Sequence, residues 1–198
     1  MFNLKNLFTH ALLALMLVTG AGAASAGPTY HVTIDTAGLS GSGVLDFLFS
    51  GDASSAGAAT ATLSNFSGAF AGATPYGDVS GDVGTSLVFD NVNGYAELLQ
   101  LVNLGGQFGF DLRFDLAPLG DGTSFSFALY DPAFTSYLGI NGDLAKFELI
   151  PGSPIGVSAD NALSTTTIAS EVPEPASLAS LALGLALMGS TLRARRKQ

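Results

Sequence analysis

Carboxylates are the only abundant reactive side chains in this chain. Its 198 residues include 16 Asp and Glu, two His and no Cys. Without Cys there is no thiolate nucleophile, no disulfide and no Cys-ligated zinc or iron–sulfur site. Two carboxylates can act as acid and base on a glycosidic bond, but only where a fold holds them at a suitable separation. Asp is also a common turn residue, so we expect a non-catalytic protein.

Neither histidine belongs to a recognisable catalytic or metal-binding pattern. His10 lies in an apolar N-terminal segment, and His31 lies on the polar side of an alternating segment. A His-dependent triad also needs a nucleophile and an orienting acid. The chain has no G-x-S-x-G and no H-E-x-x-H sequence. We therefore expect His31 to be an exposed strand residue and exclude a His-based metal site.

A calcium site is one alternative use of the acidic residues. Hard oxygen ligands of the kind that Ca²⁺ prefers occur in the predicted loops. They are Asp78, Asp82, Asp121, Asn141 and Asp143. No EF-hand loop or calcium-binding nonapeptide is present, and the nearest match, residues 90–94, puts Val92 at a ligand position. Calcium is therefore possible, but no cofactor is required.

Carbohydrate binding is the other alternative for the acidic part of the chain. Sugar-binding proteins commonly present aromatic rings, and this chain has no Trp and five Tyr. Tyr76 follows Pro75 in a Gly-rich segment and is the best candidate for an exposed ring. A tyrosine that simply packs on its own turn is the plainer interpretation.

Charge is distributed unevenly along the chain. The formal net charge is −9, but residues 27–174 hold all 16 acids and only two bases, which gives this part −14. Such a body is repelled by phosphate backbones, so nucleic-acid binding is excluded. Both ends of the chain are apolar and carry only basic charges.

The N-terminal end has the features of a secretory signal peptide. Lys5 supplies a positive charge, and residues 7–18 are mostly apolar. Small residues then lead to Ala24 and Ala26, which occupy the first and third positions of an A-x-A cleavage sequence. We expect a signal peptidase to cleave after Ala26, so that residues 1–26 form the signal peptide and the rest is exported.

The C-terminal end combines three elements in a fixed order. A short sequence, Val172-Pro173-Glu174-Pro175, precedes an uncharged span and a basic tail, residues 193–198. Residues 175–192 would extend roughly 27 Å as a helix, enough to cross the hydrocarbon core of a bilayer. We predict a transmembrane helix over 176–192. The basic residues are expected to hold the tail in the cytoplasm. They are Arg193, Arg195, Arg196 and Lys197.

This order of elements resembles the PEP-CTERM sorting signal of Gram-negative bacteria over residues 172–198. The resemblance implies that Pro173, Glu174 and Pro175 are read by exosortase, a membrane-embedded cysteine protease. It implies that the arginines act as a retention cluster. The protein would be anchored transiently in the inner membrane and then delivered to the cell envelope or the extracellular matrix. Extracellular polysaccharide would then be a possible partner.

Between the two ends, residues 27–168 have the period-two pattern of strands with one buried face. The alternating segments are 30–35, 45–49, 87–89, 107–116, 124–129 and 146–149. Gly, Asp and Asn turn sequences separate them. We predict an all-β fold, a single antiparallel β-sandwich of jelly-roll type with about 8–10 strands. An up-and-down barrel is the alternative, and in either case most Phe residues form the core.

Four segments are less regular. Residues 95–104 have apolar residues compatible with a helical turn, but we favour a strand. We predict a strand near 59–66 and then a loop from Gly68 to Gly84, where large apolar residues are few. The run 164–167 is rich in Thr, a good strand former, so we predict a last strand there. A linker that carries the Pro-Glu-Pro sequence follows over 169–175.

Overall fold

The structure, a computed structural model, describes residues 27–159 and 162–169, which belong to a compact unit spanning Gly27–Ser170. These residues form twelve strands and no helix. The strands are β1 (Thr29–Asp35), β2 (Ser42–Gly51), β3 (Ala59–Ser67), β4 (Phe70–Gly77), β5 (Val79–Gly81), β6 (Ser86–Asp90), β7 (Tyr95–Asn103), β8 (Gln107–Leu116), β9 (Thr123–Tyr130), β10 (Asp143–Leu149), β11 (Gly156–Ser158) and β12 (Ser164–Ala169).

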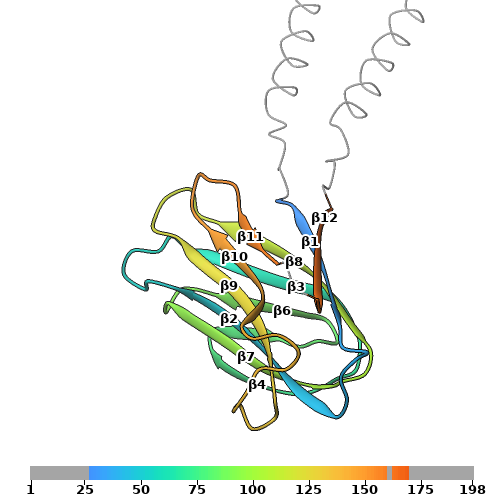
Figure 1. Cartoon of the computed structure of the whole chain (residues 1–198). Coiled ribbons are helices and arrows are strands. Elements are labelled where there is room, and N and C mark those ends of the chain that lie inside the picture. Colours follow the sequence, from blue (N-terminus) through green and yellow to red (C-terminus); the bar gives the residue numbers. More distant parts are fainter. Residues whose placement is uncertain (1–26, 160–161, 170–198) are drawn as a thin grey trace, which may run out of the picture. The chain divides into compact units, whose positions relative to one another are not determined.

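The strands form two six-stranded sheets. Sheet A has the order β12-β1-β8-β3-β6-β5, and sheet B has the order β11-β10-β9-β2-β7-β4 (Figure 1). Neighbouring strands in both sheets are antiparallel, and the pairing is nested: β1 with β8, β2 with β7 and β3 with β6. The prediction of an all-β fold is therefore confirmed. The described residues form two separate antiparallel sheets, not the closed barrel that was the alternative.

A shared aromatic core joins the two sheets. Phe47 on β2 contacts Phe110 on β8, with ring centroids 5.5 Å apart and nearly perpendicular planes. Tyr30 on β1 meets Phe147 on β10 in the same edge-to-face manner at 5.1 Å. Such pairs add to the stabilisation from burial of apolar area. The prediction that most Phe residues form the core is confirmed. The buried phenylalanines are Phe47, Phe49, Phe89, Phe108, Phe110, Phe114, Phe125, Phe127 and Phe147.

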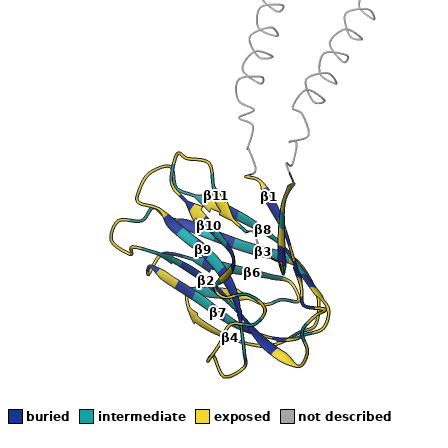
Figure 2. Ribbon diagram, in the orientation of Figure 1, coloured by how far each residue is buried: buried dark blue, intermediate teal, exposed yellow. Residues whose placement is uncertain are grey.

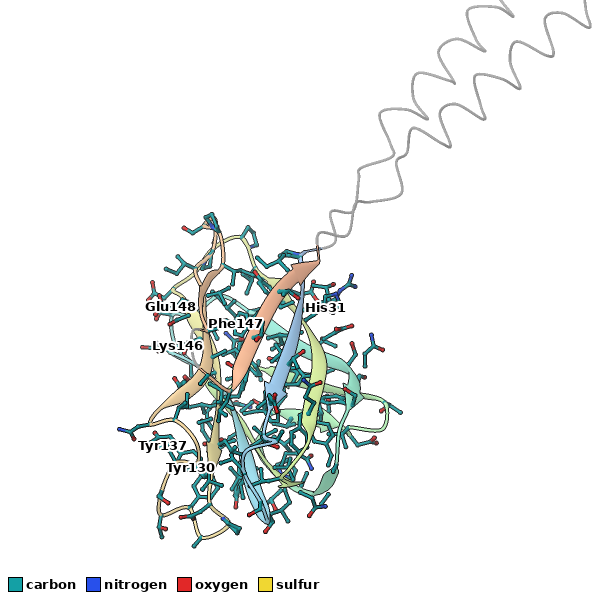
Figure 3. All side chains as sticks on the ribbon, turned by 45° about the vertical axis from the view of Figure 1, so that its right-hand side comes forward. His31, Tyr130, Tyr137, Lys146, Phe147 and Glu148 are labelled. Carbon is teal, nitrogen blue, oxygen red and sulfur yellow. The ribbon has the colours of Figure 1, made fainter. Side chains whose placement is uncertain are left out.

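Strand β10 shows how the sequence period sets the two faces of a sheet. Phe147 is fully buried in the core, whereas its neighbours Lys146 and Glu148 lie on the opposite side of the strand (Figure 3). The Lys146 Nζ atom lies 3.3 Å from a carboxylate oxygen of Glu148. Alternation of this kind is what a strand with one buried face requires.

Most predicted strands are present, and the predicted loop from Gly68 to Gly84 is wrong. The segment 95–103 is strand β7, as favoured, and the predicted final strand is β12. Within 68–84, however, β4 pairs with β7, and the short strand β5 pairs with β6. Both are edge strands: β4 is exposed along most of its length (Figure 2), and β5 has only three residues. Hydrogen bonds to the neighbouring strands β7 and β6 hold them in place. Their sequences therefore do not show the alternation of apolar and polar residues by which a strand is recognised.

The predicted signal peptide and the predicted C-terminal transmembrane helix lie outside the described residues. Within residues 27–159 and 162–169, the structure contains no helix of the length and apolarity needed to cross a membrane.

Candidate functional site

The predicted processing residues also lie outside the described part of the chain. They are Ala24, Ala26, Val172, Pro173, Glu174, Pro175, Arg193, Arg195, Arg196 and Lys197. The geometry that can be analysed is therefore that of the two-sheet domain.

The outer face of sheet B carries an acidic pair on neighbouring strands. Asp46 lies on β2 between the buried residues Leu45 and Phe47, so its side chain points away from the core. Glu97 lies on β7, where it is paired in register with Leu48. This diagonal placement lets the two carboxyl groups form a hydrogen bond with each other.

The pKa of Asp46 is raised strongly by its surroundings. Burial raises the pKa of Asp46 from its ordinary value of 3.8 to about 7, and the negative charge and hydrogen bond of Glu97 add to the effect. Asp143 on β10 contributes further repulsion. Below about pH 7, Asp46 therefore holds a proton that it can donate to Glu97. One Asp46 oxygen, Oδ1, is buried and accepts no hydrogen bond from the described residues.

Two exposed tyrosines flank the acidic pair. The hydroxyl of Tyr95 donates to Glu97 Oε2, and Tyr76 on β4 is the register partner of Glu97. The hydrogen bond with Glu97, followed by burial, raises the pKa of Tyr95 to about 12. The two tyrosines are 41% and 47% exposed, respectively, so their rings are available to a ligand. Tyr76, the best candidate for an exposed ring, is exposed on strand β4, so the plainer interpretation that it packs on its own turn is wrong.

A second aromatic group lies at the start of the β9–β10 loop. The ring of Tyr130 stacks on Phe134 with centroids 4.6 Å apart, and it lies 4.5 Å from Tyr137 (Figure 3). Asp131 holds the loop by accepting hydrogen bonds from the backbone and hydroxyl of Thr135 and from two neighbouring residues. These bonds lower the pKa of Asp131. Asp131 thus anchors the loop, in which Phe134 has a φ of 59°, a value uncommon for a bulky residue.

His31 lies on the outer face of sheet A, on the opposite side of the domain from Lys146 (Figure 3). Its Nδ1 atom is hydrogen-bonded to Asp111 Oδ1, and the amide of Asn65 donates to Asp111 Oδ2 at 2.6 Å. The His31 side chain is 48% exposed, so the prediction of an exposed strand residue is confirmed. The geometry is that of a surface His–Asp pair.

The calcium candidates are used in separate turns and strands. The Asp78 carboxylate accepts hydrogen bonds from Asn93, and Asp82 accepts one from the backbone N–H of Gly84. The backbone of Asp121 bridges to Ala56, and Asp143 begins β10. Asn141 lies in the loop that precedes it. In the described part of the chain, no group of three His, Cys, Asp or Glu side chains is arranged to hold a metal ion.

The acidic pair was not among the predicted site residues. Each acid occupies an outward position of an ordinary strand, and only the register of β2 against β7 brings the two together. The arrangement presents carboxyl oxygens that can accept hydrogen bonds from a polar ligand.

Comparison with known proteins identifies the class of signal at the C-terminus. Residues 171–197 match the family described as the PEP-CTERM protein-sorting motif, which confirms the resemblance found in the sequence. The chain therefore carries the C-terminal sorting signal of an exported protein, of the kind that exosortase recognises at the membrane. No curated protein and no solved structure gives a significant match to the chain.

Proposed function

We propose that this chain is a precursor whose two ends serve export and sorting, and whose β-domain is the delivered product. The match at residues 171–197 is the observation that carries the proposal. In this scheme a signal peptidase removes residues 1–26, and an exosortase-type protease acts near Pro173-Glu174-Pro175. The domain then functions in the cell envelope or in an extracellular polysaccharide matrix.

The domain is proposed to be a non-catalytic structural or interaction module. Its nested strand pairing, β1 with β8, β2 with β7 and β3 with β6, supports a sandwich of jelly-roll type. The described titratable groups are consistent with this role: Asp46 is hydrogen-bonded to Glu97, and His31 is bound to Asp111 at the surface.

Carbohydrate binding is the second candidate function. It is favoured by the exposed rings of Tyr76 and Tyr95 beside the carboxyl groups of Asp46 and Glu97. Aromatic rings cover the apolar faces of sugars, and carboxylates accept hydrogen bonds from sugar hydroxyls. The calcium alternative has less support, because its candidate residues lie in separate turns.

The sorting proposal is tested by replacing Pro173, Glu174 and Pro175 together with Ala in a Gram-negative host that contains exosortase. Immunoblots of inner-membrane, outer-membrane and medium fractions follow both the mass and the location of the protein. We expect the variant to accumulate in the inner membrane at the mass of the unprocessed form. The wild-type chain should be shortened and leave that membrane.

The matched control replaces one Glu and two Pro within the domain: Glu148, Pro151 and Pro154. This variant changes the same residue types and should be processed and released like the wild type. Unchanged processing of the Pro-Glu-Pro variant would reject the sorting proposal. Retention of both variants would attribute the defect to misfolding.

A further inference from the structure

Each sheet of the domain ends in two edge strands, and three of these four edges have features that hinder pairing with a further strand. Strands β5 and β11 have only three residues each. Strand β4 carries Pro75, which has no backbone N–H, and a bulge between Phe70 and Ala73 breaks its register against β7. Short strands, prolines and bulges are the means by which proteins keep their sheet edges from associating.

The fourth edge strand, β12, has none of these features. Its six residues include no Pro and no charged residue, and Thr165 to Ile168 is an unbroken run of β-branched residues. They pair with β1 in one continuous antiparallel register without a bulge. Among the described residues β12 is the last strand of sheet A, so one side of its backbone faces no other strand (Figure 1). Such an edge is a template for a further strand.

The hydrogen bonds to β1 show which backbone groups of β12 face the open edge. The N–H of Asp35 donates to the carbonyl oxygen of Leu163, the residue before β12, at 2.7 Å. Hydrogen-bonded and non-hydrogen-bonded pairs alternate in an antiparallel ladder. The odd-numbered residues of β12 therefore exchange hydrogen bonds with β1, whereas Thr166 and Ile168 direct their N–H and C=O groups away from β1.

Two apolar side chains lie uncovered beside this open edge. Ile168 is in register with the buried Tyr30 and points to the core side of sheet A, yet it is 62% exposed. Val157 on β11 is in register with the buried Phe147 and points to the core side of sheet B, yet it is 40% exposed. Tyr30 contacts Phe147 across the sandwich, so the two edges lie on the same side of the domain. A further strand beside β12 would cover part of this apolar side.

The distribution of charge favours a second copy of this chain as the occupant of the edge. Residues 27–170 carry 14 acids and two bases, so two copies repel each other over most of their surface. The β12 edge is an exception, because β11 and β12 contain no charged residue and the one acid of β1, Asp35, is its last residue. A cationic partner would be attracted to the acidic remainder of the surface, whereas Thr side chains pair favourably with one another across strands.

We propose that two copies of the domain associate by antiparallel pairing of their β12 strands, which joins the two A sheets into one. The register centred on Thr166 places all three inward-facing residues of each β12 within the pair, with Ile168 opposite Ser164 of the other copy. Thr165 of each copy then lies opposite Thr167 of the other. Because the other three edges are hindered, the association closes at two copies. This inference goes beyond sorting and carbohydrate binding and depends on neither.

The absence of Cys from the chain permits a direct test by disulfide formation. Full-length Thr165→Cys and Thr167→Cys variants are purified in detergent, mixed at submillimolar concentration and oxidised with copper phenanthroline. Opposite residues in a non-hydrogen-bonded pair have Cα atoms about 4.5 Å apart, within the range that a disulfide spans. We expect the mixture to form a disulfide-linked dimer, which a non-reducing gel detects.

Each Cys variant alone should form at least tenfold less dimer than the mixture. Two copies of the same residue are displaced by two positions along the paired strands, which places their Cα atoms roughly 8 Å apart, too far for a disulfide. The matched control mixes Thr60→Cys with Thr62→Cys, which have the same spacing on the interior strand β3 of sheet A, and should form no dimer. No dimer in the first mixture, or as much dimer from each variant alone, would overturn the proposal.

Two further changes, each made in both Cys variants, test whether the open edge is the contact. Thr166→Pro removes an N–H that points away from β1, so the pairing of β12 with β1 keeps its hydrogen bonds. Ile168→Lys places a charge on the edge. Each should reduce dimer formation at least tenfold with the circular dichroism of the wild type. Ile150→Lys, at an exposed apolar position outside β12, should leave dimer formation within twofold. A dimer that persists in both β12 variants would contradict the pairing.

Discussion

Replacement of Asp46 by Asn should make the domain more stable above neutral pH. Asp46 is held in the fold with its pKa raised to about 7, first by burial and then by Glu97. At higher pH the folded state must carry two adjacent negative charges, one of them partly buried. Asn has the shape of a protonated Asp and can still donate to Glu97, so the variant keeps the hydrogen bond without the second charge.

The size and sign of the effect follow from proton linkage. In the folded state Asp46 keeps its proton up to about pH 7, whereas in the unfolded chain it releases that proton near its ordinary pKa of 3.8. The free energy of unfolding therefore falls as the pH rises from about 4 to about 7. A shift of about three pKa units corresponds to ~4 kcal/mol as an upper limit. Solvent reaches part of the Asp46 side chain, which makes the effect smaller than this upper limit. We expect the free energy of unfolding to fall by about 1–2 kcal/mol over this pH range.

Urea unfolding of residues 27–170, followed at several pH values between 4 and 8.5, measures this dependence. Asp46→Asn should flatten the curve and exceed the wild type by about 1–2 kcal/mol at pH 8. Glu148→Gln removes a charge from an exposed position of the same sheet and should stay within about 0.5 kcal/mol of the wild type. If the free energy of unfolding had the same pH dependence in the wild type and in the Asp46→Asn variant, the reasoning would be refuted.

Two further pairs of substitutions, each a test with its control, probe backbone geometry and packing by the same unfolding assay. Gly81 has a φ of +87°, and a Cβ there would lie 1.9 Å from the carbonyl oxygen of Ser86. Gly81→Ala should therefore cost more than ~1 kcal/mol, whereas Gly38→Ala, with no atom within 4 Å, should cost little. Phe127→Ala should cost about 3–5 kcal/mol, because Phe127 is fully buried. Phe134→Ala should reduce the free energy of unfolding much less, because the Phe134 side chain is 40% exposed. Equal losses of stability in the two Phe variants would contradict the assignment of Phe127 to the core.

The central strands were predictable because each carries its own evidence. In β8 the inward residues Phe108, Phe110, Leu112 and Phe114 alternate with polar or small residues, and all four are buried. Such a segment buries one face whatever its neighbours are, so its period alone identifies it. The turn residues add independent evidence, as at Gly94 and Gly142, which have the positive φ values that tight turns require.

The edge strands were not predictable in the same way. Strand β4 has mostly small and exposed side chains, and β11, which was not expected, has only three residues. Each exists because a neighbouring strand offers it hydrogen bonds, β7 for β4 and β10 for β11. That pairing is a property of the whole sheet, so local residue patterns do not reveal it.

The same distinction applies to the functional residues. The sorting signal is a linear pattern over residues 171–197, so the sequence alone was sufficient to recognise it. The meeting of Asp46 with Glu97 depends on the register between β2 and β7. The anchoring of the Gln100 amide nitrogen depends on the bulge in β4, which brings two carbonyl groups to it. Neither feature has a sequence signature.

The charge of the domain restricts the polymers that it can hold. Residues 27–170 carry 14 acids and two bases, and an anionic polysaccharide would be repelled unless cations bridged the two surfaces. The described residues contain no group of three acidic or His side chains that could fix such a cation. A neutral or amino-bearing polymer needs no bridge, because its hydroxyl and amino groups can donate to the carboxyl groups on the outer face of sheet B.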